Sequence, residues 1–206
     1  VFDFLEYNTR PTKLFKHLLV GQFRMRRNIY KLINQEIENA REGKKAEITL
    51  KLNSIQDPRM IARLYDASNA GEKIRMIVRG TCSLVPGQVG FSENIEAISI
   101  VDRFLEHSRI YMFHNEGQEK IYLSSADLMT RNLFFRIECA FPVYDQDIKQ
   151  EIIDFLNIQF QDNVKARIID KGQTNTYKQD HGSEPKRAQV MMYAYYRDKL
   201  LSKIDE

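Results

Sequence analysis

Three stretches decide how this chain folds and where its chemistry lies: IVRGTCSLVPGQVG (residues 77–90), IVDRFLEHSRIYMF (residues 100–113) and IYLSSADLMTRN (residues 121–132). The first places Arg79 at the end of an apolar run. The second contains His107, followed two residues later by Arg109, and the third contains a Ser-Ser-Ala-Asp turn. Arginine, histidine and small hydroxyl residues all bind phosphate oxygens. We therefore expect the three stretches to handle phosphate.

The residues before the first stretch predict a parallel pair of strands. Residues 46–52 alternate as a strand does, and a helix follows, with Asp57 as its N-cap and Gly71 at its end. Residues 74–78 then form a buried strand. A strand, a helix and a second strand in this order give a right-handed crossover and a parallel pair. Ligands of such sheets bind beyond the carboxyl ends of the strands, which is where Arg79 lies.

The remaining pattern predicts an α/β fold with a mixed or parallel sheet flanked by helices. We expect further strands over residues 95–101, 109–113, 120–123 and 134–143, the last of these closing the sheet. We expect helices over residues 25–40, 145–160 and 190–204, and the end of a helix within residues 1–10. Residues 80–93 and 170–187 read as loops, and residues 102–108 as a short turn or helix.

Length and composition bound the class of protein. With 206 residues and few Gly and Pro, the chain can bury a sizeable core and has an ordinary globular composition. No apolar run approaches the roughly 20 residues that span a bilayer, and no secretory signal is visible. Cys82 and Cys139 lack the spacing of metal ligands. We interpret them as reduced, structural thiols and expect no metal site in this chain.

One segment carries charge of a single sign. It has no Asp or Glu between Tyr7 and Gln35, and its basic residues are Arg10, Lys13, Lys16, Arg24, Arg26, Arg27 and Lys31. Such a run commonly faces a polyanion. It is equally typical of a solvated helix surface, and the residues alone leave both interpretations open.

Among the four histidines, His107 is the candidate for catalysis. Charged residues surround it, including Glu106, and a neutral imidazole can shuttle a proton or donate to a phosphate oxygen near neutral pH. We expect His17 to pack among its apolar neighbours. His114 precedes a turn and His181 lies in a polar segment, so we expect both to be solvated.

Other polar residues of the same stretches are further candidates for binding phosphate. The planar fork of Arg79 can bind phosphate oxygens bidentately. Arg103 and Arg109 either line a phosphate channel or form ion pairs with the carboxylates of their own loop, at positions 102 and 106. Ser125 and Asn132 are candidate donors, although serine-rich turns also occur simply as turns.

The order of these motifs resembles one half of a phospholipase-D-like site. That superfamily has His-x-Lys at the start of a strand and Gly-Ser-Ala-Asn after the next strand, and two such halves make one site. Here Arg109 stands in place of the lysine, Ser124–Asp127 replaces the small-residue turn, and only one half is present. These departures argue against a working half-site. A phospholipase-D-class phosphodiesterase remains one alternative, and it would have to form its site by dimerisation around His107.

Longer motifs resemble the C-terminal part of bacterial polyphosphate kinase, the ATP-dependent type. They are IVRGTCSLVPG, GFSENI, SIVDRFLEHSRIYMF and IYLSSADLMTRNLFFRIECAFPV, preceded by LKLNSI and LYDAS. The resemblance runs from about Phe2 to Asp145. It implies that residues 1–10 end the preceding catalytic domain and that residues 11–206 form the C-terminal phospholipase-D-like catalytic domain.

This resemblance implies a reversible transfer of the γ-phosphate of ATP to inorganic polyphosphate through a phosphohistidine. That histidine and the Mg²⁺ ligands would lie outside this chain, so the chain alone is expected to be inactive. The arginine and histidine that the last domain provides for ATP and phosphate fall on Arg79 and His107. The implied partners are ATP, ADP, polyphosphate, the remaining domains of the polypeptide and further copies in a homo-oligomer, without nucleic acid. The implied location is cytoplasmic, and it allows membrane association of the full-length enzyme.

The resemblance departs from the family at one loop. The chain has Gln22 where the family pattern Leu-Val-x-Pro-x-x-Met-Arg has Pro, so no phosphate contact is assigned to this loop or to Arg26. A further alternative is a non-enzymatic module that binds polyanions through the basic segment Arg10–Lys31.

Overall fold

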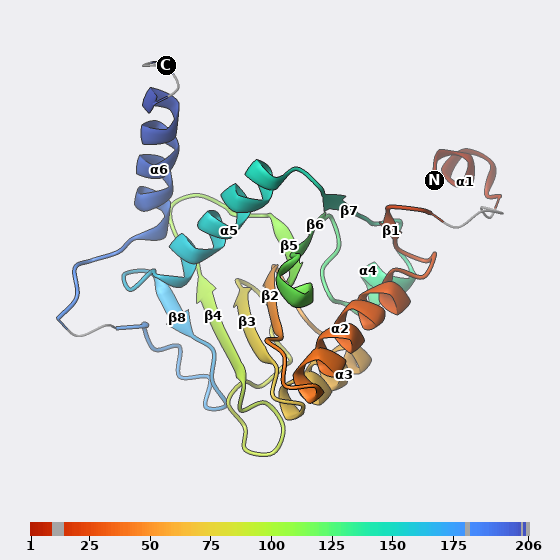
Figure 1. The fold of residues 1–206 in the computed structure, drawn as a ribbon, viewed down its shortest axis with the longest axis horizontal. Helices are drawn as coiled ribbons and strands as arrows, with labels where there is room; N and C mark the ends of the chain where they lie inside the picture. The colour runs from red at the N-terminus through yellow and green to blue at the C-terminus, as the bar shows by residue number, and fades with distance from the viewer. Residues whose placement is uncertain (10–14, 180–181, 203, 205–206) are drawn as a thin grey trace.

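Strands of the described residues form one mixed sheet, shown with its helices in Figure 1. The structure is a computed structural model and describes residues 1–9, 15–179, 182–202 and 204. The strands are β1 (Leu19–Val20), β2 (Glu47–Leu52), β3 (Lys73–Val78), β4 (Ile95–Ile100), β5 (Arg109–Phe113), β6 (Lys120–Ser124), β7 (Cys139–Val143) and β8 (Ala166–Ile168). The helices are α1 (Phe2–Tyr7), α2 (Met25–Arg41), α3 (Pro58–Asn69), α4 (Thr130–Phe134), α5 (Gln146–Phe160) and α6 (Ala188–Ser202), with a short 3₁₀ turn η1 (Asn115–Gly117).

The order of the strands confirms the predicted α/β fold. It is β1-β7-β6-β5-β2-β3-β4-β8 across the sheet. β2, β3 and β4 run parallel, and the other neighbouring pairs are antiparallel. The predicted crossover through α3 therefore produces the parallel pair β2 and β3, with Leu52 opposite Val78 at their carboxyl ends.

Two helices begin where their sequences predict. Asp57 accepts a hydrogen bond from the backbone N–H of Met60 at 2.9 Å, and Pro58 occupies the first turn of α3. Gly71, with φ of 93°, follows the end of this helix. Asp145 caps α5 in the same way as Asp57 caps α3. None of the described helices is long and apolar enough to cross a membrane.

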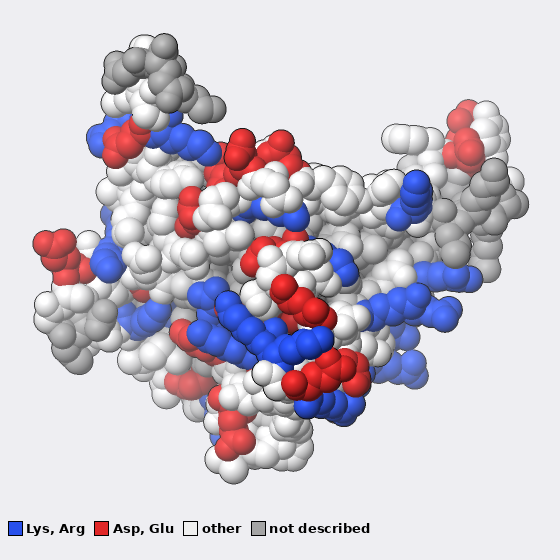
Figure 2. Space-filling view, viewed as in Figure 1, with Lys and Arg blue, Asp and Glu red and all other residues white. Residues whose placement is uncertain are grey.

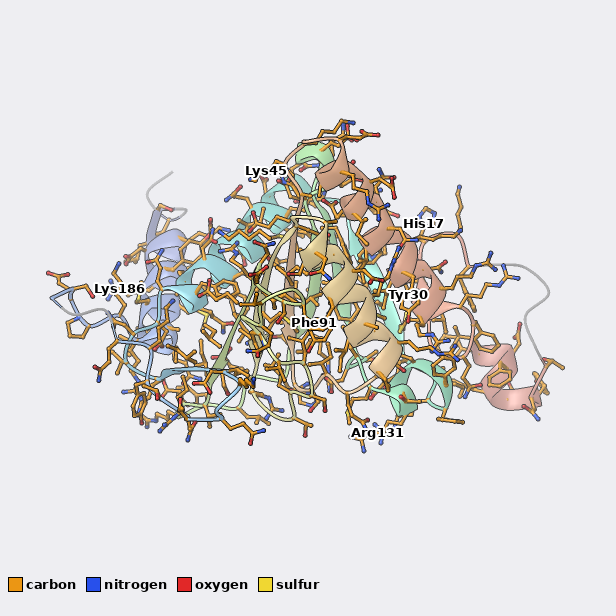
Figure 3. All side chains as sticks on the ribbon, turned by 90° about the horizontal axis from the view of Figure 1, so that it is seen from below. His17, Tyr30, Lys45, Phe91, Arg131 and Lys186 are labelled. Carbon is orange, nitrogen blue, oxygen red and sulfur yellow. The ribbon has the colours of Figure 1, made fainter. Side chains whose placement is uncertain are left out.

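Helices cover both faces of the sheet, so the hydrophobic core has two parts. Figure 3 shows α2 and α3 (salmon and tan) on one side of the sheet and α5 and α6 (cyan and blue) on the other. Successive residues of β3 point to opposite faces, as strand geometry requires. Met76 and Val78 pack with Leu64 of α3, whereas Ile77 packs with Leu156 of α5.

Two predictions about strands are wrong. The expected strand over residues 134–143 begins only at Cys139, because Phe134 ends α4. The apolar residues read as strand include Phe135, which is 74% exposed and belongs to neither hydrophobic cluster of the described residues. β7 is also not the last strand of the chain, because β8 follows it in sequence and pairs with β4 at the opposite edge of the sheet; its three residues are too few to show a pattern.

A buried carboxyl group at the amino end of β3 makes stability depend on pH. Glu72 is 0% exposed, and neither of its carboxylate oxygens has a hydrogen-bond partner among the described residues. Burial raises the pKa of Glu72 to about 9, and the charge of Glu36 adds to the shift. The folded chain therefore keeps a proton that the unfolded chain releases near its ordinary pKa of ~4.3.

We expect Glu72→Gln to remove a pH-dependent loss of stability. Below the unfolded pKa the group is protonated in both states and adds no pH-dependent penalty; as pH rises toward the folded pKa, the folded state loses stability by up to ~1.4 kcal/mol per pH unit. Urea unfolding at pH 5 and pH 8 should show that the free energy of unfolding of the variant, relative to the wild type, is higher at pH 8 than at pH 5. Glu42→Gln, at an exposed glutamate, is the control. Parallel changes with pH in all three proteins would contradict the assignment.

Candidate functional site

Segments that are distant in sequence meet at the carboxyl end of the parallel strands, which we call the carboxyl edge of the sheet. β2, β3 and β4 all end there, and β5 begins there because it runs antiparallel to β2. Asn53 follows β2, Arg79 follows β3, and the loop 101–108 with His107 joins β4 to β5. This edge is where open α/β sheets bind ligands.

A continuous hydrogen-bond network joins Arg79 to His107 along this edge. Arg79 donates from Nε to the side-chain oxygen of Asn53. The backbone N–H of Asn53 donates to Oδ1 of Asp127 at 2.8 Å, and Oδ2 of Asp127 accepts from Arg109 at 2.9 Å. Nη1 of Arg109 lies 3.1 Å from Nδ1 of His107. The structure thus brings together residues from all three of the stretches that the sequence singled out.

The terminal nitrogens of Arg79 have no hydrogen-bond partner in the part of the chain that the structure describes. Among the described residues no carboxylate lies within ion-pair distance of it, and Nε carries its one side-chain hydrogen bond. A Cβ on Gly80 would lie 2.8 Å from the carbonyl oxygen of Asn53. Glycine at this position lets the end of β3 approach the backbone of Asn53.

A buried ion pair fixes Arg109. The side chains of Arg109 and Asp127 are only 11% and 8% exposed. Burial pushes the pKa of Asp127 upward, but hydrogen bonds from Arg109 and from the backbone N–H groups of Ser54 and Asn53 outweigh it, so the net pKa is lowered. Asp127 is therefore ionised at neutral pH and holds Arg109 toward His107.

His107 faces a cavity beside the ion pair. The cavity has a volume of about 810 Å³ and is lined by His107, Ser108, Arg109, Leu123, Ser124, Ser125, Arg136, Glu138, Cys139 and Phe141. The imidazole itself is exposed. Nη1 and Nη2 of Arg109 lie 3.1 and 3.4 Å from Nδ1 and Nε2 of His107, so the guanidinium faces the imidazole ring and can donate to whichever ring nitrogen carries no proton. The lining of this cavity offers an imidazole, two guanidinium groups and small hydroxyl residues, together with the carboxylate of Glu138.

A carboxylate that the sequence did not single out holds Ser125 and Asn132. Glu138 accepts hydrogen bonds from the hydroxyl of Ser125 and from the side-chain amide of Asn132, the latter at 2.7 Å. The hydroxyl oxygen of Ser125 also accepts from the backbone N–H of Cys139 at 3.1 Å. Ser125 lies at the cavity, whereas Asn132 is only 3% exposed and is not part of its lining.

Ion pairs of Arg103 or Arg109 with the carboxylates of the loop 101–108, one of the two interpretations of these arginines, are not formed, since these carboxylates bind cations from elsewhere. Arg187 lies 2.5 Å from Asp102, and Lys51 of β2 lies 2.9 Å from Glu106. Arg103 stays outside the network, with its guanidinium 5.4 Å from the ring centroid of the following phenylalanine. These partners are 55 or more residues away, which a local reading of charge cannot reveal.

The other histidines do not take part in this site. His17 is exposed rather than packed, and its Nδ1 lies 2.6 Å from the hydroxyl of Tyr144. His114 is partly buried rather than solvated, with Nδ1 3.6 Å from Glu119. His181 lies outside the described residues.

The basic segment forms a separate surface. Figure 2 shows Lys and Arg side chains over the beginning of α2, and Arg27 and Lys31 are exposed there. Arg10 and Lys13 lie outside the described residues. Arg26 is engaged, since its guanidinium lies 4.0 Å from the ring centroid of Phe134.

The loop before α2 has its own local structure. Gln22 has φ of 61°, and its side-chain amide donates to the carbonyl oxygen of Phe135 at 2.8 Å. Proline fixes φ near −65° and cannot adopt this conformation. Gln22, which stands where the family pattern has Pro, therefore has a backbone conformation that proline cannot adopt.

The described residues do not fit a metal site. Among them, no group of three or more His, Cys, Asp or Glu side chains could hold a metal ion. Cys82 and Cys139 are free and partly buried, and burial raises the pKa of both thiols. A raised pKa suits structural rather than nucleophilic cysteines.

Sequence reasoning missed the residues that connect the site. Asn53 links Arg79 to Asp127, and Glu138 links Ser125 to Asn132. Asn53 directly follows β2, so the strand-end rule that selects Arg79 could have found it. Glu138 has no such signal.

Comparison with known proteins identifies the family. The family model described as polyphosphate kinase C-terminal domain 2 matches residues 18–189. The polyphosphate kinase of Vibrio parahaemolyticus is 52% identical over 198 residues, which make up 96% of this chain and 28% of that protein. The chain therefore spans less than a third of that relative.

Solved structures agree with the sequence match. The crystal structure of polyphosphate kinase from Porphyromonas gingivalis aligns with a TM-score of 0.92 at 46% identity, covering 96% of this chain and 30% of that one. NUC from Salmonella typhimurium, a phospholipase D family member, aligns with a TM-score of 0.53 at 11% identity, covering 75% of this chain and 98% of that one. The second likeness concerns the fold alone. The chain thus has a phospholipase-D-like fold and belongs to the polyphosphate kinase family, within which it matches C-terminal domain 2.

Proposed function

We propose that this chain forms part of the ATP- and polyphosphate-binding site of a polyphosphate kinase, with Arg79 and His107 in contact with phosphate. The enzyme would transfer the γ-phosphate of ATP reversibly to inorganic polyphosphate. The phosphohistidine and the Mg²⁺ ligands would lie in other domains, and residues 1–10 would end the preceding one. The observation that carries this proposal is the network from Arg79 to His107, at the carboxyl edge of the sheet in a chain of this family.

The chemistry of phosphoryl transfer suits this arrangement. The transition state is loose and spreads negative charge over the phosphoryl oxygens, so the protein acts mainly by positioning and by neutralising charge. Arg79 offers two terminal nitrogens that are unpaired among the described residues, on a guanidinium that Asn53 contacts through Nε. A neutral His107 could donate to a phosphate oxygen, and a cationic His107 could stabilise the departing diphosphate. Arg109, held by Asp127, lines the cavity beside it.

We expect Arg79→Ala to weaken binding of polyphosphate to this chain by about 10- to 100-fold. A hydrogen bond to a charged group contributes roughly 1.5–3 kcal/mol, which corresponds to that range. Isothermal calorimetry with polyphosphate and with Mg-ATP, at two salt concentrations, measures the effect. Binding by the wild-type chain itself should be weak, because the rest of the enzyme's site is absent.

A double variant separates this proposal from binding through the basic surface. Arg27→Ala with Lys31→Ala removes two exposed cations from α2 and leaves the sheet edge intact. The proposal predicts that this double variant binds nearly as well as the wild type. If it loses binding, if binding falls steeply with salt, and if Arg79→Ala has no effect, the chain is a polyanion-binding module that uses its basic segment.

A further inference from the structure

The loop 101–108 carries His107 but has no regular structure of its own. Its apolar side chains do not anchor it, since Val101, Phe104 and Leu105 are 69%, 65% and 77% exposed. An unanchored loop would leave the imidazole free to move. Figure 1 shows this loop (light green) passing beside the first turn of α6, and its hydrogen bonds lead there.

Gln189, in the first turn of α6, holds the backbone of the loop. Its Oε1 accepts from the N–H of Phe104 at 3.1 Å, and its Nε2 donates to the carbonyl oxygen of Phe104 at 2.9 Å. One side-chain amide thus satisfies both backbone groups of one residue. The same Nε2 lies 3.1 Å from Oε1 of Glu106 and donates to it. Gln189 therefore binds the loop at two residues just before His107, at the backbone of Phe104 and at the side chain of Glu106.

Glu106, the neighbour of His107, is held from three elements. Lys51 of β2 donates to its Oε2 at 2.9 Å, and Gln159 of α5 donates to the same oxygen. The side chains of Lys51 and Glu106 are only 5% and 16% exposed. Burial lowers the pKa of Lys51, and the Glu106 carboxylate opposes this shift. With Gln189 on the other oxygen, Glu106 has little freedom to move.

Arg187 holds the other end of the loop. Its Nε and Nη2 donate to the two carboxylate oxygens of Asp102 at 2.8 and 2.5 Å. The hydrogen bond from Arg187 is the main cause that lowers the pKa of Asp102. Bidentate pairs of this kind fix orientation as well as distance.

The beginning of α6 is itself fixed to the body of the fold. Asp162 is 0% exposed, and its Oδ2 accepts from the backbone N–H of Ala188 at 2.7 Å. Its Oδ1 accepts from three successive backbone N–H groups, those of Val164, Lys165 and Ala166, where β8 begins. Residues 187–189 are thus a rigid point from which the loop is held.

We propose that Gln189 and Arg187 are positioning residues for His107. They hold the loop 101–108 so that the imidazole stays beside Arg109 and faces the cavity. The proposal rests on the proposed function, because it concerns the geometry of the same site. Neither residue lines the cavity, and each acts only through the loop.

The test uses Gln189→Ala and Gln189→Glu in full-length polyphosphate kinase that carries this chain. The glutamate has the same size but cannot donate to Phe104 and repels Glu106. We expect kcat to fall about 10- to 100-fold in both variants, the range expected of a displaced catalytic group. KM for ATP should change less than kcat, because the contact from Arg79 is retained. Val190→Ala changes the next residue of α6, which is 58% exposed, and should retain wild-type kcat.

A second measurement needs no catalysis. Amide exchange of Phe104 and the NMR signals of the His107 ring, recorded on this chain, should show lost protection and a mobile ring in Gln189→Ala. A well-protected Phe104, or an unchanged kcat despite lost protection, overturns the positioning role. If His107→Ala itself leaves kcat unchanged, the proposed function fails instead, and the NMR result alone decides whether Gln189 holds the loop.

Discussion

Replacing Asp127 by Ala should lower the free energy of unfolding by about 3–5 kcal/mol, the usual cost of removing one partner of a buried ion pair. The substitution leaves Arg109 only 11% exposed and without its counter-charge. It also takes the acceptor from the backbone N–H groups of Asn53 and Ser54, which now lie 2.8 and 3.0 Å from Oδ1. Urea unfolding of this chain measures the loss directly.

The matched control is a surface ion pair. Asp66 pairs with Arg63 on α3 at 2.9 Å, with side chains 59% and 29% exposed. Asp66→Ala should cost no more than about 1 kcal/mol. Equal, small losses in both variants would mean that the Arg109–Asp127 pair does not hold the site together.

Acid should reproduce part of the Asp127→Ala effect. The folded pKa of Asp127 is lowered, so its contribution to stability is present above the unfolded pKa of ~3.9 and is lost as pH falls through the folded value. The wild-type chain should therefore lose this contribution below about pH 4, whereas Asp127→Ala should not.

Replacing His107 by Ala should lower kcat of the full-length enzyme by about 10²- to 10⁴-fold, the range that general acid–base groups contribute. His107 is exposed to the cavity and lies against a guanidinium held by a buried carboxylate, so its position is defined before substrate binds. Initial rates of polyphosphate synthesis from ATP measure the loss, and urea unfolding verifies that the variant enzyme is folded.

Another exposed histidine is the control for this variant. His17 contacts Tyr144 and lies outside the network, so His17→Ala should keep kcat near the wild-type value. A His107→Ala enzyme with kcat within threefold of wild type would show that His107 does not act in the chemical step.

The sequence predicts most of the fold because its signals are local. A few neighbouring residues are enough to predict the N-cap at Asp57, the turn at Gly71 and the alternation of the strands. The parallel pair then follows from chain connectivity. The short edge strand β8 and the late start of β7 were not predicted. In both places, contacts with distant residues decide where the strand lies.

The same limit applies to the site. Arg79 can be predicted because it follows a buried strand, and the strands that end beside it are also visible in sequence. The partners of the loop cannot be predicted, since Asp102 and Glu106 pair with Arg187 and Lys51, far away along the chain. The nearest basic residues in sequence are arginines of the loop itself, but in the folded chain basic residues from β2 and from the start of α6 lie closer to the two carboxylates.

The phosphodiesterase alternative meets a chemical difficulty in the structure. The position of the superfamily's lysine is taken by Arg109, whose guanidinium is committed to Asp127 and lies against His107. A second such half would have to come from another copy of the chain. Hydrolysis of a nitrophenyl phosphodiester by this chain alone, lost in His107→Ala, would support that alternative.

The most direct test of the phosphate site is a crystal structure of the full-length enzyme with a non-hydrolysable ATP analogue. Phosphate oxygens should lie about 2.7–3.2 Å from the terminal nitrogens of Arg79 and from the ring of His107, within hydrogen-bond distance. Phosphates bound along Arg27 and Lys31 of α2, with Arg79 facing only solvent, would contradict the assignment.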